Sequence, residues 1–433
     1  MIVIDIELLK QAYQDFNSKK AEYIKAYNYF KGDTDALRNY KMVTQRSNNK
    51  CRVNFVKKLV NEEVSYCFGN DITYISNSNN NKILNKINST NKNINENITT
   101  DLAKYMLICG IAYEIAYVDR NGNFNLKTIK GHEGYYYNEG GVEFFLHIYN
   151  RKLDNKTYID VYTKNAICHY DEEFKEIAPA SVHIFSRVPI SVAKLSEEEI
   201  TDTIYWDIKG LQDSYETNLS DISNEISDFR NAYLKVINAQ LDDEELPRMK
   251  ELGIIQAESA NNNVTIEWLI KNINDTFIQN TLNTVEDKIY QTSCHINHNE
   301  KLQSNLSGVT LRNRLISLEN KCKLITKSLT NAIKSRLQLM IEYINLTENK
   351  AYDWKDIDIK FTPNIPSDDL MTAQIISQLN GLISEDTALS LLSFINNPAT
   401  EKDKKSKEQE NDVNTIGKQL LDNVGVADEQ AEN

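Results

Sequence analysis

The chain has 433 residues, of which 41% are hydrophobic, and its 49 basic and 62 acidic side chains give a net charge of −13. This length allows two to four domains. The acidic balance argues against a protein that grips nucleic acid by neutralising its phosphates, although it does not exclude a protein past which nucleic acid slides. No run approaches the roughly 18 apolar residues of a membrane span. The scattered cysteines and a start unlike a signal peptide indicate synthesis and retention in a reducing cytoplasm.

The N-terminal half is predicted to be α+β. Helices are expected at 8–30, 54–68 and 100–115, with a strand at 72–75, and 77–97 is expected to be a surface loop with at most a short helix around 83–87. From Ala112 to about Ile184 the hydrophobic period changes to two, which indicates antiparallel strands, notably 144–149, 157–163 and 166–170. Asn121-Gly122 is typical of a tight hairpin, because Gly supplies the positive φ that such turns need.

The middle of the chain predicts two long helices with a small module between them. Helices are expected at 204–233 and 276–294, because their apolar residues recur every three or four positions. Between them we expect strands at 233–239, 253–257 and 264–269 and a short acidic helix at 242–252. Ile237–Lys271 is therefore an inserted α/β module. A polar loop, Ile296–Leu306, follows the second helix.

Val309–Leu346 predicts one uninterrupted helix roughly 57 Å long. Its apolar stripe is compatible with a long core helix or with a helix that spans two layers of an assembly. Beyond it we expect a strand at 356–362 and a helical pair at 370–383 and 386–395, the second capped by Ser384. The charged residues beyond Glu401 are expected to be disordered, apart from a helical turn at 415–421.

No pattern in the sequence predicts catalysis, a metal or a cofactor. Gly417-Lys418 lacks the upstream Gly of a phosphate-binding loop, and neither HExxH nor GxSxG occurs. Cys294, His295 and His298 form a single Cys/His cluster, which we interpret as ordinary loop side chains because structural zinc needs four ligands. The runs of acidic residues are typical of solvated surface. We therefore expect no enzyme activity.

Several segments, taken in order, resemble the portal proteins of tailed bacteriophages, in particular those of siphophages of Gram-positive hosts. They are Tyr29-Phe30-Lys31-Gly32-Asp33, Tyr66-Cys67-Phe68-Gly69-Asn70-Asp71-Ile72-Thr73-Tyr74, Ser220-Asp221-Ile222-Ser223-Asn224 leading into Ala232-Tyr233-Leu234, and Leu306-Ser307-Gly308-Val309-Thr310-Leu311. The resemblance runs from about Leu8 to Pro398. Its specificity lies in the ordered set and not in any single motif.

The resemblance implies a mainly α, partly α+β, portal-like fold with long stem and wing helices, an antiparallel β-containing wing and a small α/β clip. The implied parts are a wing (1–203), a stem helix (204–236), the clip (237–271), a second stem helix (272–295), a tunnel loop (296–308), a long wing helix and strand (309–366), a helical crown (367–400) and the tail (401–433).

The resemblance also implies a ring, dodecameric in this family, at one capsid vertex of the virion, through which double-stranded DNA passes without sequence specificity. The implied partners are the terminase large subunit, head-completion or adaptor proteins, and the major capsid and scaffold proteins. Three groups of residues follow: a DNA-facing tunnel loop (His298, Asn299, Lys301, Gln303, Ser304, Asn305), a partner-docking clip (Asp242, Asp243, Glu244, Glu245, Arg248, Lys250) and an oligomer seam (Leu311, Leu315, Leu318, Ile325, Leu329).

Two other functions are compatible with the sequence. A helical scaffold or adaptor of a phage particle would have no need of an α/β module at Ile237–Lys271. An enzyme with paired carboxylates would require two acidic side chains that the fold brings together, which sequence spacing alone does not show. For the loop Ile296–Leu306, the alternative to DNA contact is an ordinary solvated linker.

Overall fold

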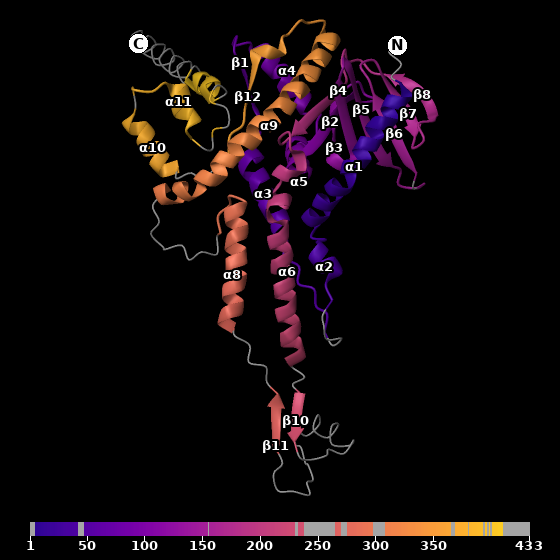
Figure 1. The fold of residues 1–433 in the computed structure, drawn as a ribbon. Coiled ribbons are helices and arrows are strands. Elements are labelled where there is room, and N and C mark those ends of the chain that lie inside the picture. The colour runs from indigo at the N-terminus through magenta and orange to yellow at the C-terminus, as the bar shows by residue number, and fades with distance from the viewer. Residues whose placement is uncertain are drawn as a thin grey trace, which may run out of the picture. The chain divides into compact units, whose positions relative to one another are not determined.

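The computed structural model describes residues 5–41, 47–154, 156–229, 233–237, 265–269, 275–297, 308–364, 369–379, 381–392, 395, 398 and 401–409. Over these residues the chain combines helices with antiparallel sheets, which confirms the predicted fold class (Figure 1). The chain forms two compact units: unit 1 comprises Met1–Ala26, Leu59–Thr203 and Lys301–Asn433, and unit 2 comprises Tyr27–Lys58 and Ile204–Glu300. No helix among the described residues is long and apolar enough to cross a bilayer.

A five-stranded antiparallel sheet in unit 1 packs against helix α1 (Ile6–Lys31). Its strands follow chain order: β4 (Gly134–Glu139), β5 (Val142–Asn150), β6 (Thr157–Tyr162), β7 (Ala166–Asp171) and β8 (Glu176–Val182). Leu9, Ala12 and Phe16 of α1 are buried against Phe144 and Leu146 of β5. Buried apolar residues recur every three or four positions on the helix and every second position on the strand, so each element buries one face.

A second sheet in unit 1 has the order β3-β2-β9, with β2 at Ile111–Val118, β3 at Phe124–Lys130 and β9 at Ile190–Lys194. The predicted hairpin is confirmed, because β2 and β3 pair antiparallel and Gly122 has φ +84°. The prediction of a helix to Ile115 was wrong: α5 (Ile98–Cys109) ends at Gly110, which has φ +77°. This left-handed residue stops the helix and starts the strand.

Helix α9 (Gly308–Glu348) confirms the predicted long helix. Its C-terminal half shares a core with α4 (Asn81–Asn91), β1 (Thr73–Ser76) and β12 (Ile357–Lys360), the last two of which pair antiparallel. The prediction of a surface loop at 77–97 was wrong. Ile83 and Ile87 of α4 are buried, and the Asn80 side chain caps the helix by accepting from the backbone N–H of Lys82 and Ile83. The prediction followed the polar, Asn-rich composition of the segment. It gave too little weight to two isoleucines four residues apart, which lie on one face of a helix.

A buried ion pair links α9 to β2. The Arg336 guanidinium donates from Nε and Nη2 to the two carboxylate oxygens of Glu114, at 2.8 and 2.6 Å, and from Nη1 to the Thr99 hydroxyl at 2.8 Å. Arg336 is 3% exposed and Glu114 is fully buried. Removing one partner would leave a charge in the core without compensation.

Unit 2 contains α2 (Asp35–Asn39), α6 (Ile204–Phe229), α8 (Asp275–Thr292) and the antiparallel pair β10 (Tyr233–Ile237) and β11 (Thr265–Leu269). It also holds the last residues of α1 and the first of α3 (Phe55–Phe68), because residues 27–58 pack with α6. This grouping differs from the predicted boundary, which placed all of 1–203 in one part. The predicted helix at 242–252 and strand at 253–257 lie outside the described residues.

The C-terminal region contains α10 (Asp369–Gln378) and α11 (Glu385–Ser390). The predicted cap is confirmed, because the Ser384 hydroxyl accepts from the backbone N–H of Thr387 at 3.2 Å. The prediction of disorder beyond Glu401 was wrong for residues 401–409, which are helical. Lys404 pairs with Glu401 one turn earlier at 3.2 Å, and Lys405 pairs with Glu385 of α11 at 2.6 Å. Both pairs are exposed, so each contributes little to stability.

Candidate functional site: the polar face of helix α6

Helix α6 carries a buried polar stripe on the face that it turns toward residues 47–55. Gln212, Glu216, Ser220 and Asn224 recur every four residues, and each is at most 1% exposed. We call these four side chains the polar ladder. Buried polar groups cost free energy unless they are hydrogen-bonded, so the stripe requires a partner that matches its spacing.

The partner is the extended backbone between Asn49 and Phe55. Every second backbone N–H donates to one rung of the ladder: Phe55 to Gln212 Oε1 (3.1 Å), Val53 to Glu216 Oε1 (3.0 Å), Cys51 to Ser220 Oγ (2.9 Å) and Asn49 to Asn224 Oδ1 (2.6 Å). Two residues of extended chain advance about 6.6 Å, and four residues of helix advance about 6.0 Å. The two periods therefore agree over four rungs. The side chains of α6 accept the hydrogen bonds that the backbone of a neighbouring strand would otherwise accept.

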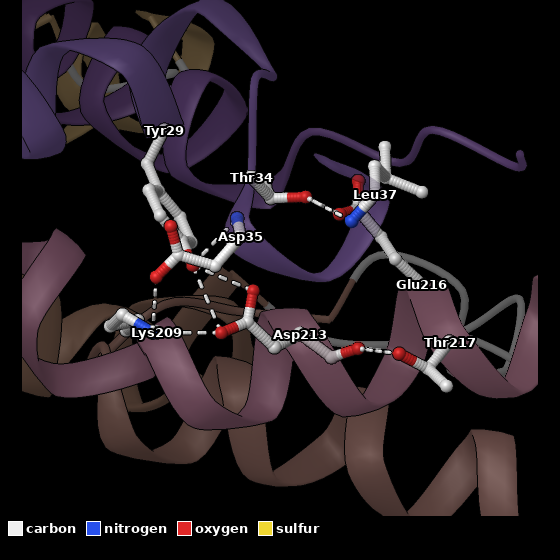
Figure 2. Close-up of polar contacts among 8 residues, drawn as sticks. All are labelled: Tyr29, Thr34, Asp35, Leu37, Lys209, Asp213, Glu216 and Thr217. Atoms are coloured by element: carbon white, nitrogen blue, oxygen red, sulfur yellow. Dashed lines mark hydrogen bonds and ion pairs between the residues drawn. The ribbon is translucent and has the colours of Figure 1, made fainter. Parts of the chain in front are cut away.

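Glu216 lies in the middle of the ladder and also joins it to α2. Its second carboxylate oxygen, Oε2, accepts from the Thr34 hydroxyl, whose oxygen caps α2 by accepting from the backbone N–H of Leu37 at 3.3 Å (Figure 2). Burial raises the pKa of Glu216, and the hydrogen bonds from Thr34 and Val53 oppose that rise. Both oxygens of this carboxylate therefore accept hydrogen bonds from within unit 2.

A second polar cluster lies beside the ladder. The Tyr29 hydroxyl donates to the Asp213 carboxylate (2.8 and 2.9 Å) and accepts from the backbone N–H of Asp35 (3.1 Å). Lys209 bridges Asp35 (3.2 Å) and Asp213 (2.9 Å), as Figure 2 shows. Burial, and then the hydrogen bond to Asp213, raise the pKa of the Tyr29 hydroxyl. The ammonium group compensates the two carboxylates, so the cluster holds α1, α2 and α6 together.

An open hollow of about 410 Å³ borders this cluster, and it is lined by Asp35, Ala36, Asn39, Asp213, Ser214, Thr217 and Asn218. The two acidic residues in its lining are the ones that Lys209 already pairs. Among the described residues, no group of three or more His, Cys, Asp or Glu side chains is arranged to hold a metal ion. The hollow therefore provides a polar recess without a nucleophile–base pair or a ligand set.

Two of the three predicted groups of site residues cannot be compared with the structure. The tunnel-loop residues (His298, Asn299, Lys301, Gln303, Ser304, Asn305) and the clip residues (Asp242, Asp243, Glu244, Glu245, Arg248, Lys250) lie outside the described residues. Both groups remain predictions.

The predicted oligomer seam needs a correction. Leu318, Ile325 and Leu329 are 7%, 2% and 0% exposed within a single chain, so they have almost no apolar surface left for a neighbouring copy. The stripe belongs to the core of unit 1, which was the alternative interpretation of the long helix. Leu315 is only partly buried, and the side chain of Leu311 lies outside what is described.

The polar ladder was missed by sequence reasoning, although a signal was present. The pattern Gln-x-x-x-Glu-x-x-x-Ser-x-x-x-Asn runs along one side of a helix whose adjacent side carries the apolar stripe. Two stripes on one helix indicate two packed faces. Identifying the partner of the second stripe required the structure, because an extended segment that pairs with side chains has no hydrophobic period of its own.

Comparison with known proteins shows the family of the chain. Residues 9–415 match the family model described as "Phage portal protein, SPP1 Gp6-like". The chain belongs to this portal family. The family is a structural one, and the predicted resemblance to the portal proteins of bacteriophages is confirmed.

Individual relatives are distant. The portal protein of Bacillus phage SPP1 is 21% identical over 417 residues, which cover 89% of this chain and 81% of that protein. A chain from the neck of an empty gene transfer agent particle, computed with C6 symmetry, is 10% identical with a TM-score of 0.46, and one from a native gene transfer agent virion is 11% identical with a TM-score of 0.45. Each comparison covers 78% of this portal protein and 88% of the other chain.

Proposed function

We propose that this portal protein assembles side by side into a closed ring at one capsid vertex of the virion, and that double-stranded DNA passes through the ring during packaging and ejection. The observation that carries the proposal is the family match over residues 9–415. A head-to-tail contact between identical copies closes into a ring when the rotation allows it. The net charge of −13 per copy supports passage, because an acidic channel repels the duplex.

The parts of such a ring can be assigned to elements of the chain. We assign α6 and α8 to the stem, β10 and β11 to the clip, the β-rich part of unit 1 together with α9 to the wing, and α10 with α11 to the crown. The antiparallel pairing of β10 with β11 supports the clip assignment. It also disfavours a purely helical scaffold or adaptor, which has no need of a stranded insertion between two helices.

The clip residues Asp242–Lys250 are proposed to dock the terminase large subunit during packaging and head-completion proteins afterwards. The sequence has no phosphate-binding loop, so ATP hydrolysis would be supplied by the terminase. The major capsid and scaffold proteins are proposed to meet the ring while the head assembles in the host cytoplasm.

The tunnel loop is proposed to contact DNA through His298, Asn299, Lys301, Gln303, Ser304 and Asn305. Lys301 would approach phosphates without reading base sequence. Shortening Asn297–Asn305 should impair packaging and leave assembly intact. Normal packaging by the shortened protein would identify the loop as an ordinary linker.

Sedimentation velocity of the purified protein tests the ring most simply. A closed ring predicts one large species that persists on dilution, whereas a monomer at high concentration contradicts the proposal. Replacing residues 238–264 with a short flexible linker tests the clip separately. That variant should still form rings but lose terminase binding, and retained binding would contradict the docking assignment.

A further inference from the structure

Three polar side chains are connected across three neighbouring strands of the five-stranded sheet: Asp160 on β6, His169 on β7 and Ser181 on β8. Asp160 is directly opposite His169, and Nδ1 of the imidazole lies 2.7 Å from Oδ1 of the carboxylate. At the other side of the ring, Nε2 lies 3.3 Å from the Ser181 hydroxyl. We call these three side chains the Ser181 cluster. No sequence motif marks it, because strand pairing brings its members together.

The direction of these hydrogen bonds follows from the chemistry of the three groups. A carboxylate only accepts, so Nδ1 of His169 donates to Asp160. In a neutral imidazole the other nitrogen then carries the lone pair, so Nε2 accepts from the Ser181 hydroxyl. The carboxylate therefore fixes the tautomer in which a histidine can take a proton from a serine while the serine attacks an electrophile.

The pairing of β7 with β8 is irregular at this cluster. Ser181 is opposite Ile167, whereas Ala178 is opposite His169, so β8 inserts one extra residue between two positions of β7. Such β-bulges re-aim side chains and are over-represented next to active sites. Because Ile167 and His169 are two positions apart, they point to the same face of the sheet. Ser181, as the partner of Ile167, points to that face too.

The members of the cluster differ in their access to solvent. The side chain of Asp160 is 14% exposed and that of His169 is 26% exposed. Ser181 lies on β8, all seven residues of which are exposed. A reactant can therefore reach the serine Oγ from solvent, while the carboxylate that orients the imidazole is mostly covered.

A second histidine leaves the charge of Asp160 available to the cluster. Nδ1 of His147, on β5, lies 4.0 Å from the other oxygen of this carboxylate. Burial, and then the nearby Lys127 ammonium, lower the pKa of His147 to about 3, so its ring is neutral near pH 7. The carboxylate can therefore stabilise the positive charge that develops on His169 when that ring takes a proton.

We propose that Ser181 is an activated nucleophile toward acyl esters, with His169 as its general base and Asp160 as the residue that positions the base. The serine Oγ forms a bond to the carbonyl carbon, its proton passes to Nε2, and the π electrons move onto the carbonyl oxygen. Collapse of this intermediate breaks the bond to the alcohol, which takes the proton from Nε2. Water then repeats both steps, so one ester and one water become one acid and one alcohol.

Esters with good leaving groups are the fitting substrate class, because a good leaving group lowers the barrier that an open site on an edge strand must overcome. The inference does not depend on the proposed ring, and it revises the expectation of no enzyme activity at this one site. A purely structural role of the cluster, as a cross-strand polar contact, predicts instead that Ser181 is no more reactive than other exposed serines.

Reaction of the purified full-length protein with a fluorophosphonate probe tests the proposal. The probe forms a bond from phosphorus to an activated serine oxygen with loss of fluoride, and peptide mass spectrometry locates the modified residue. Wild type should be labelled at Ser181, and Ser181→Ala should remove that label. Ser89→Ala is the matched control, at an exposed serine of α4 whose hydroxyl donates to the carbonyl of Lys86 at 2.9 Å, and it should change nothing. Absent labelling of Ser181 in wild type would overturn the proposal.

Hydrolysis of p-nitrophenyl acetate tests the substrate class. Wild type should release p-nitrophenol at least tenfold faster than Ser181→Ala, and the Ser89→Ala control should match wild type. Equal rates for wild type and Ser181→Ala would overturn the assignment of esters as substrates.

Substitutions of the other two members separate chemistry from structure. His169→Ala should slow labelling of Ser181 at least tenfold, and added imidazole should restore part of the rate by supplying the missing base. Asp160→Asn should also slow it at least tenfold, whereas Asp160→Glu, which keeps the carboxylate, should recover part of the rate. Circular dichroism checks that each variant is folded. A folded His169→Ala variant labelled as fast as wild type would overturn the role of the base, and equal rates in the two Asp160 variants would overturn the positioning role.

Discussion

Helices α9 and α6 each bury one face, but the buried side chains are apolar on α9 and polar on α6. In unit 1, α9 presents an apolar stripe, and Cys322, Ile325, Leu329 and Leu337 are each at most 4% exposed. In unit 2, α6 presents the polar ladder and satisfies it with the backbone of residues 49–55. Apolar burial is non-directional, whereas a buried polar stripe demands partners at fixed positions. A spacing of three and four therefore indicates that a helix face is packed, but it does not indicate which segment covers that face. A polar stripe restricts the covering segment more than an apolar stripe does.

The buried ion pair of unit 1 should give the largest effect. Arg336→Met leaves the Glu114 carboxylate uncompensated in the core and should cost about 3–5 kcal/mol in the free energy of unfolding. Lys334→Met, an exposed substitution two residues away on α9, is the control and should change it by less than about 0.5 kcal/mol. Urea denaturation followed by circular dichroism measures both, and equal stabilities would show that the pair contributes little.

The apolar stripe of α9 should give the next effect. Leu329→Ala removes a fully buried side chain and should cost about 2–5 kcal/mol. Leu324→Ala, at a side chain that is 66% exposed on the same helix, should cost much less. Measurement on dilute, unassembled protein is decisive, because a loss seen only after assembly would return Leu329 to a seam between copies.

The polar ladder should give a smaller and more local effect. Glu216→Ala deprives the Val53 N–H and the Thr34 hydroxyl of their acceptor and should cost about 1–3 kcal/mol. Thr217→Ala, the next residue on α6 but outside the ladder, is the control. Hydrogen exchange should show lost protection of the Val53 amide in the first variant only. Equal protection in both variants would show that the ladder does not hold this segment.

The pH dependence of the same residue should be the smallest effect. Burial raises the pKa of Glu216 above its ordinary value of 4.5, so its contribution to folding is most favourable below that value and is lost as pH rises through the raised pKa. Glu216→Gln removes the titrating group. Relative to wild type, this variant should gain stability as pH rises from 4 to 7. A difference that stays constant across this range would contradict a raised pKa.

The parts that the sequence predicted share one property, which is that neighbours in the chain determine them. The α9 stripe, the Gly122 turn and the Ser384 cap all follow from local spacing and local hydrogen bonding. The errors arose where a distant partner decided the outcome. Ile83 and Ile87 were assigned to a loop because their core partners come from α9 and β12. Leu318, Ile325 and Leu329 of α9 were assigned to a neighbouring copy, although their own chain buries them.

The ladder shows the same limit at the candidate site. The spacing of Gln212, Glu216, Ser220 and Asn224 is visible in the sequence, but their partner lies more than 150 positions earlier in the chain. Residues 27–58 were grouped with the wing because nothing local connects them to α6. Only the match between the periods of an extended segment and a helix explains why the two pair.

A cryo-electron microscopy map of the assembled protein, viewed down its symmetry axis, tests the central claim most directly. The account predicts a closed ring with an open bore, in which Leu318, Ile325 and Leu329 stay covered by their own chain. A compact particle without a bore, or a ring in which the α9 stripe faces the neighbouring copy, would contradict it.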